Sequence, residues 1–363
     1  MWELLKQWFK DYFAEPEVAI LLICAVVAVL AVVLLGHIFA PILAGLVIAY
    51  LLESLITPLH KRLHLPRWLS VTLVYSLFIG VVLFLVLGLL PLLWKQLLGV
   101  ASDWPVMIAG LHTYLNTLPT KYPNYISQDL IQDLLGSTDI GIDRLTSIGK
   151  IVVTYTVNSL PNLVSWLVYL FLVPLTVLFF LKDKLLLQHW AHRYLPERSG
   201  LLQTVGREMK SQLGNYVRGK VIEVIVVGIM TYIGFRIFDL NYAVLLAFCV
   251  GLSVIIPYVG MVVVTIPVVI IGLLQYGTGS EFGYMLAVYL VIQALDGNVF
   301  VPLLFSEAVN LHPVAIIAAV LFFGSVWGFW GLFFAIPLAT LVNAIISAWV
   351  NHAVQLKQMK EFD

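Results

Sequence analysis

The sequence predicts an all-α, polytopic membrane protein with about eight transmembrane helices, some of them broken or re-entrant. Hydrophobic residues make up 61% of the 363 residues, charged residues make up only 11%, and the mean hydropathy is +0.99. Soluble domains typically have about a quarter of their residues charged. Five long tracts without Asp, Glu, Lys or Arg support the same conclusion.

These tracts are long enough to cross a bilayer, since a helix needs about 20 apolar residues to span roughly 30 Å of hydrocarbon. They cover residues 18–52, 68–94, 151–181, 240–280 and 308–356. The first and the last two are too long for one crossing. We expect each of these to be interrupted by residues that turn or break helices, namely Gly36, His37 and Pro41, then Pro257 and Gly260, then Gly328 and Gly331. A further tract, 221–238, carries Glu223 and Arg236 near its ends.

The chain is expected to contain five regions. These are transmembrane helices 1–3 in residues 1–94, a periplasmic helical insert in 95–150, transmembrane helix 4 in 151–181, a cytoplasmic amphipathic segment in 182–220 and a C-terminal transmembrane core in 221–363. Pro105, Pro119 and Pro123 punctuate the insert, and Ser127 can cap a short helix after them. In the amphipathic segment, apolar residues at helical spacing predict a helix that lies on the inner membrane surface or packs against another helix.

The basic residues set the expected orientation. Residues 182–220 contain eight Lys or Arg against three acids, so the positive-inside rule places this segment in the cytoplasm. Counting crossings from there places the N- and C-termini in the cytoplasm and the insert outside. The first apolar run is too long for a signal-peptide core and is expected to be a retained helix.

Enzyme and cofactor motifs are missing from the sequence. The nearest match, GNYVRGKV from Gly214, has Val221 where a phosphate-binding loop needs Ser or Thr. The sequence contains no HExxH, GxSxG or dinucleotide-binding loop, and Cys24 and Cys249 lie in apolar tracts without a CxxC motif. From these missing motifs we expect no enzyme activity, no cofactor and no metal site. The net charge of zero predicts no nucleic-acid partner.

Asp296 is the strongest candidate for a functional side chain, because an ionisable group within an apolar segment is costly unless paired, hydrated or functional. Gly297 and Asn298 follow it, and Asp-Gly-Asn is typical of turns. We therefore expect the helix to break here, with Pro302 as a second weak point. Broken helices line solute or ion sites in transporters, which makes this segment, with Gln293, a candidate site. Alternatively, the Asp only caps a half-helix or pairs with another segment.

A second break is expected at Pro257 and Gly260, where Pro removes a backbone donor and Gly loosens the chain. It indicates either a re-entrant hairpin or a kinked crossing, and it either lines a pore or only bends the chain. Glu223, one helical turn after Lys220, is either an ion at the membrane interface or a carboxylate that couples transport to an ion. Glu53 is expected to be exposed near a helix end.

Gly324 and Gly328 have the GxxxG spacing that lets helices approach closely. Helix packing, within a subunit or between subunits, accounts for this spacing better than contact with a substrate. The aromatic residues 327, 329 and 330 are consistent with a membrane-interface belt or with a turn.

Several blocks of the sequence resemble the autoinducer-2 exporter family of bacterial membrane proteins, within it the PerM permease branch. The blocks are PILAGLVIAYLLESLITPL from Pro41, FFLKDK from Phe179, NYVRGKVIEVIVVG from Asn215, IPYVG from Ile256, QALDGNVFVPLLFSEAVNLHP from Gln293 and FWGLFFAIPLATL from Phe329. The resemblance implies an inner-membrane permease that assembles as a homo-oligomer. It also implies that the segments around Asn215 (with Arg218), Pro257 and Asp296 belong to a shared transport core. Similar proteins have been associated with export of the furanone-type signal autoinducer-2, and others with exchange of sodium or lithium for protons.

Three functions remain open at this point. The first is a secondary transporter that exports a small polar organic solute by alternating access, with Gln293, Asn298 and backbone near Pro257 binding the solute and Asp296 binding a proton or cation. The second is a sodium or lithium/proton antiporter that uses Asp296, helped by Glu223. The third is a non-transporting scaffold whose outer insert and amphipathic helix bind partner proteins.

Overall fold

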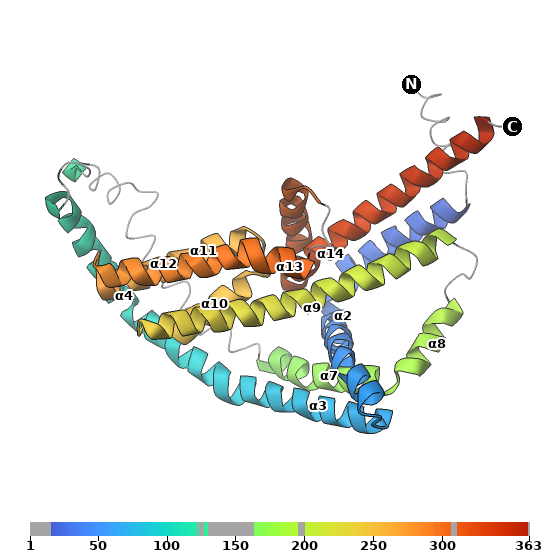
Figure 1. Ribbon diagram of the computed structural model, residues 1–363, viewed down its shortest axis with the longest axis horizontal. Helices are drawn as coiled ribbons and strands as arrows, with labels where there is room; N and C mark the ends of the chain where they lie inside the picture. Colours follow the sequence, from blue (N-terminus) through green and yellow to red (C-terminus); the bar gives the residue numbers. More distant parts are fainter. Residues whose placement is uncertain are drawn as a thin grey trace.

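The computed structural model of the chain describes residues 16–121, 123, 127–129, 163–194, 200–305 and 311–361. Every regular element in these ranges is a helix, and the helices form an elongated molecule (Figure 1). Five of the helices described are long and apolar enough to cross a membrane, and two shorter helices are also apolar. The predicted all-α, polytopic membrane fold is therefore confirmed.

The N-terminal helix α2 (Pro16–Arg62) is continuous, which corrects the expected interruption between Gly36 and Pro41. It bends instead of breaking (Figure 1), because Pro41 removes one backbone hydrogen bond while the neighbouring turns keep theirs. Its second half packs against α3 (Arg67–Phe84) and α7 (Leu163–Lys182), and their shared core contains Ile56, Val74 and Val177.

A second long helix runs through Trp94, where the outer insert was expected to begin. Helix α3 continues through the π-helical turn η1 (Leu85–Leu89) into α4 (Leu90–Lys121), which gives one helix of 55 residues. At 1.5 Å per residue it is about 80 Å long, far more than the hydrocarbon thickness. The insert therefore begins as an extension of a membrane helix, and Pro105 and Pro119 do not interrupt it. The short helix predicted after Ser127 lies mostly outside the described residues.

The cytoplasmic segment expected at 182–220 contains α8 (Lys184–Tyr194) and the first half of α9 (Gly200–Ile237). Helix α9 continues without interruption into the apolar tract. Tyr216 and Val217 are buried in this helix, and the Tyr216 hydroxyl donates a hydrogen bond of 3.0 Å to the carbonyl oxygen of Phe333. At Tyr216 and Val217 the segment therefore packs against other helices, which was one of the two expected alternatives. A position on the membrane surface stays a prediction for the rest of the segment.

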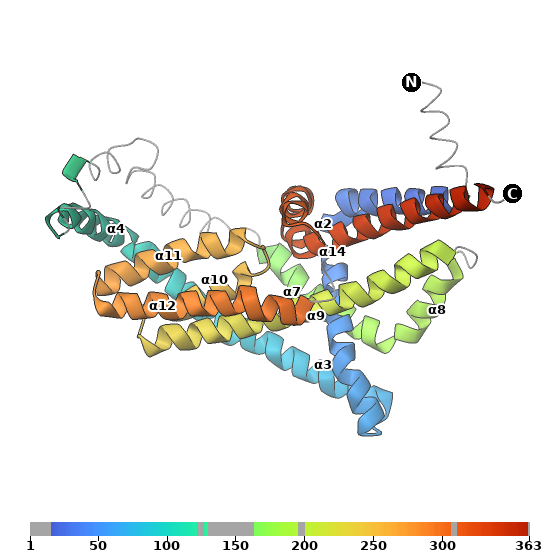
Figure 2. The ribbon, with the colours of Figure 1, turned by 45° about the horizontal axis from the view of Figure 1, so that its top comes forward.

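The C-terminal core contains four helices that run side by side, as Figures 1 and 2 show. They are α9, α10 (Ala243–Ser253), α11 (Val259–Tyr276) and α12 (Ser280–Leu295). Their inner faces form one hydrophobic core that includes Val227, Val250 and Tyr289. The predicted break near Pro257 is confirmed, because residues 254–258 form a turn in which Tyr258 has a φ of 62°.

The expected break at Asp296 is wrong. Helix α12 continues through the π-helical turn η3 (Asp296–Phe300) into α13 (Val301–Phe305), and Pro302 does not interrupt it. The Asp-Gly-Asn sequence therefore widens the helix and does not end it. A π-helical turn adds one residue to the turn and redirects the side chains around it, and such turns are common at functional sites.

The last helix, α14 (Pro313–Glu361), folds back on itself at Gly328, whose φ of 59° and ψ of −135° are not helical. The two arms approach closely at Gly331, where an added Cβ would lie 1.8 Å from the carbonyl oxygen of Phe323. Gly324 also serves helix packing within the chain, since an added Cβ there would lie 2.6 Å from the Leu332 side chain, whereas Gly328 forms the turn and its Cβ would meet nothing within 4 Å. The aromatic residues lie at this turn. Both were among the expected alternatives.

Gly260 gives a direct test of the packing at the confirmed break. An added Cβ would lie 1.9 Å from the carbonyl oxygen of Ser253, so Gly260→Ala is expected to destabilise the protein by about 1–3 kcal/mol. Gly283→Ala is the matched control, because its Cβ would meet nothing within 4 Å and Ala favours helix. Thermal unfolding in detergent measures both, and equal midpoints for the two variants would contradict this packing.

Candidate functional site

The candidate site lies on helix α9, where two oppositely charged side chains are buried together. Lys220 is 4% exposed and Glu223 is 1% exposed. Lys220 Nζ lies 2.6 Å from Glu223 Oε2, and the two residues are one helical turn apart. Among the described residues, this Glu223 oxygen has no hydrogen-bond donor besides that charged contact. The pair is thus an ion pair removed from water, which is costly unless further contacts support it.

Helix α10 supplies one of these contacts. It ends at Ser253, and its last carbonyl groups have no donor within the helix. Lys220 Nζ donates a hydrogen bond of 2.8 Å to one of them, the carbonyl oxygen of Val254. The ammonium group also lies 5.1 Å from the centre of the Phe305 ring, within the range of a cation–π interaction. The break before Pro257 therefore frees a backbone group that binds the buried cation.

Asp296 faces the same cluster from the π-helical turn η3. It interacts electrostatically with both Lys220 and Glu223. Its Oδ1 is buried and accepts no hydrogen bond from any described residue. The cluster of Lys220, Glu223 and Asp296, which we call the charged cluster, therefore holds two carboxylates and one ammonium group. One carboxylate lacks a cation, and at membrane depth that excess favours binding of a proton or a metal cation.

A chain of polar side chains continues from the charged cluster between α11 and α12. Gln293 lies one turn before Asp296 and donates a hydrogen bond of 2.9 Å to the Tyr289 hydroxyl. That hydroxyl lies 2.7 Å from Thr265 Oγ1. Thr231, two turns after Glu223 on α9, is fully buried, and its hydroxyl has no partner among the described residues. Polar groups therefore follow the core of the four-helix region away from the charged cluster.

The remaining predicted site residues lie in three places. Gly297, Asn298 and Pro302 are exposed, and Asn298 Nδ2 only donates a bond of 2.8 Å to the carbonyl oxygen of Ala294 in its own helix. Pro257 lies in the turn whose backbone reaches Lys220, and Gly260 packs on that turn. Asn215 and Arg218 contact each other, with a distance of 3.3 Å between Arg218 Nη2 and Asn215 Oδ1, and lie outside the charged cluster.

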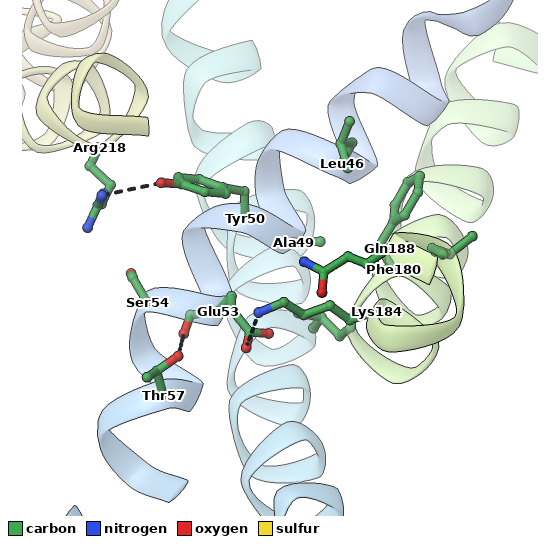
Figure 3. A pocket seen from close by; sticks show the side chains of 12 residues that line it. Leu46, Ala49, Tyr50, Glu53, Ser54, Thr57, Phe180, Lys184, Gln188 and Arg218 are labelled. Carbon is green, nitrogen blue, oxygen red and sulfur yellow. Dashed lines mark hydrogen bonds and ion pairs between the residues drawn. The ribbon is translucent and has the colours of Figure 1, made fainter. Parts of the chain in front are cut away.

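Arg218 lines a pocket of about 410 Å³ between α2, α7, α8 and α9 (Figure 3). Glu53 also lines it and is not exposed as expected: its side chain is 15% exposed. Arg67 Nη1 lies 3.2 Å and Lys184 Nζ 2.8 Å from the Glu53 carboxylate. This carboxylate therefore joins the ends of three helices, α2, α3 and α8.

The family of this chain follows from comparison of its sequence with known proteins. Residues 21–351 match the model of the AI-2E family transporter. This chain belongs to the AI-2E transporter family. It is 46% identical over 349 residues to the protein named "Putative permease PerM" of Escherichia coli strain K12, covering 96% of this chain and 98% of that relative. It is 25% identical over 339 residues to the "AI-2 transport protein TqsA" of the same organism, covering 91% of this chain and 93% of that relative.

As an AI-2E family member, the chain is a transport protein of the membrane. The sequence indicated Glu223 and Asp296, and the antiporter hypothesis used both, but it did not connect them through Lys220, because their proximity depends on how α9 packs against η3. It also missed Tyr289, Thr265 and Thr231. Hydroxyl side chains are common in membrane helices, so only their burial and mutual distances distinguish them.

The three side chains of the charged cluster are expected to contribute unequally to the stability of the protein. Lys220→Met leaves the buried Glu223 and the half-buried Asp296 without their cation, and we expect it to destabilise this family member by about 3–5 kcal/mol. Glu223→Gln should cost less, because Lys220 then has Asp296 as its partner. Adding Asp296→Asn to Lys220→Met should recover part of the loss. Thermal unfolding in detergent at neutral pH measures all three effects.

Arg236 is the matched control on the same helix. Its ion pair with Asp239, at 3.5 Å, is exposed, so Arg236→Met should cost less than about 1 kcal/mol. A Lys220→Met variant as stable as Arg236→Met would show that the charged cluster does not depend on its cation.

Proposed function

We propose that this AI-2E family member is a secondary transporter of the bacterial inner membrane that exports a small polar organic solute of the autoinducer-2 type. The family and the likeness to a protein named for AI-2 transport support the solute class. The basic segment 182–220 supports a topology with both termini in the cytoplasm. By resemblance to its family, the chain works as a homo-oligomer.

One observation carries the coupling mechanism: the charged cluster has one carboxylate more than it has cations. When Asp296 holds a proton or metal cation, Lys220 remains with Glu223 and the carbonyl oxygen of Val254. When Asp296 loses it, the unpaired carboxylate attracts Lys220 across the cluster. Because Lys220 also binds the end of α10, this shift in charge pulls on the turn 254–258.

In this mechanism, movement of that turn exposes the solute site alternately to the two sides of the membrane. Helix α10 has only 11 residues, about 16 Å, so it cannot span the hydrocarbon alone and ends within the protein. In this proposal the polar groups of Gln293 and Tyr289, which are buried and bonded to each other, bind a hydroxylated solute together with backbone at 254–258 once the turn moves. Asn298, proposed from the sequence as a solute ligand, is exposed and is a weaker candidate than Gln293.

Transport in reconstituted vesicles tests this function. Purified protein in proteoliposomes should move a labelled furanone-type solute when a pH gradient is imposed. Asp296→Asn should reduce transport to the level of protein-free vesicles, because it removes the titrating carboxylate. Asp239→Asn, at an exposed position with a side chain 84% exposed, is the control and should keep wild-type transport. Wild-type transport by Asp296→Asn would refute the assignment of Asp296.

A sodium or lithium/proton antiporter is the second candidate, and the same excess carboxylate favours it. A carboxylate that exchanges a proton for a cation needs no organic solute, and Glu223 provides a second carboxylate beside it. A pH-sensitive dye in vesicles distinguishes the two functions. An antiporter changes the internal pH when sodium or lithium is added without any organic solute, and the proposed exporter does not.

A further inference from the structure

The pocket lined by Arg218 and Glu53 is separate from the charged cluster, since neither Lys220, Glu223 nor Asp296 lines it. Figure 3 shows Lys184 from α8 reaching the Glu53 carboxylate on α2, while Arg218 from α9 lines another part of the pocket beside the Tyr50 hydroxyl. Its volume of about 410 Å³ is within the range of small-molecule sites. The charges of these side chains decide which ligands the pocket suits.

The negative charge in the pocket is already neutralised. Arg67 binds Glu53 with two hydrogen bonds, of 3.2 and 3.3 Å, and Lys184 Nζ lies 2.8 Å from the same carboxylate. Two cations therefore share one anion. A cation entering the pocket would meet no free carboxylate there, so the pocket does not suit a metal ion or an amine.

Arg218 adds a cation whose contacts are all neutral. Its Nε donates a bond of 3.1 Å to the carbonyl oxygen of Gly214, and Nη2 lies 3.3 Å from both the Tyr50 hydroxyl and Asn215 Oδ1. The guanidinium group also lies 5.7 Å from the centre of the Tyr50 ring. In the part of the chain that the structure describes, no carboxylate forms an ion pair with Arg218.

The position of Arg218 is fixed before any ligand binds. Tyr50 can approach α9 only because Gly214 has no side chain, since a Cβ there would lie 1.9 Å from the Tyr50 hydroxyl. A guanidinium group held by several neutral acceptors is preorganised and still carries an unbalanced charge. Together, Arg67, Lys184 and Arg218 exceed the single carboxylate by two positive charges.

We propose that this pocket is a binding site for a phosphate or carboxylate group carried on an apolar body. Arg218 and Lys184 contact the oxyanion, because guanidinium and ammonium groups form strong charge-assisted hydrogen bonds with it. The apolar wall, formed by side chains such as Leu46, Phe180 and Leu187, packs against the carbon part of the ligand. The same chemistry is found in a free organic phosphate and in an anionic lipid headgroup. The site does not depend on which solute the protein transports.

Ligand-dependent stability tests the free-anion source. Butyl phosphate, added at constant ionic strength to the purified full chain in detergent, should raise the unfolding midpoint saturably, by about 2 °C, and butanol should not. The rise should disappear in Arg218→Gln and Lys184→Gln and remain partly in Arg218→Lys, which keeps the charge. Arg236→Gln, an exposed arginine on the same helix, is the control and should behave as the wild type.

Retention of lipid tests the second source. Native mass spectrometry of protein purified from phosphatidylglycerol membranes should show bound lipid that Arg218→Gln loses and Arg236→Gln keeps, while phosphatidylcholine is not retained. Specific binding in either experiment supports the site and identifies its source. If neither anion binds, or if Arg236→Gln lowers binding as much as Arg218→Gln, the proposal is wrong. Failure here would leave the solute transport of the charged cluster unaffected, so the two proposals can be told apart.

Discussion

The burial of Lys220 beside Glu223, with Asp296 nearby, is the constraint on which the rest of the core depends. An ammonium group removed from water needs several partners, and it obtains them from different elements: Glu223 on its own helix, the carbonyl oxygen of Val254 at the end of α10, and the ring of Phe305 on α13. Asp296 adds a second carboxylate, whose buried Oδ1 accepts no hydrogen bond from any described residue. The stability of the core and the proposed response to a proton or cation thus depend on the same few atoms.

Two local irregularities make this arrangement possible. The turn at 254–258 ends α10 inside the protein and leaves a carbonyl group for Lys220, and the π-helical turn η3 directs Asp296 toward α9 without ending its helix. Either feature would be a defect in an ordinary membrane helix, where backbone groups must be satisfied internally. Here the freed carbonyl group binds the buried ammonium group. The Arg218 pocket lies away from this core and gives the protein a second polar region, with an excess of positive charge.

The sequence predicted the membrane fold and the break at Pro257 because charge-free tracts and a Pro–Gly pair act locally. It failed at Asp296, where apolar neighbours on both sides keep the helix continuous and turn-forming residues only widen it. It also failed at Glu53, whose burial depends on Arg67 and Lys184, 14 and 131 residues away in the chain. Asp296 and Glu223 could be named as candidates one by one. The antiporter hypothesis already used them together, but their connection through Lys220 required the packing of α9 against η3, which no local pattern contains.

The most direct test of the charged cluster as the centre of transport does not require the solute to be identified first. Vesicles containing wild-type protein, Asp296→Asn or the exposed control Asp239→Asn would be compared for every solute and ion that they retain or release under an imposed pH gradient. If the charged cluster is the centre of transport, at least one solute or ion should be distributed differently in wild-type and empty vesicles. This difference should be lost in Asp296→Asn and kept in Asp239→Asn. A species that is moved equally by wild-type protein and Asp296→Asn would contradict it.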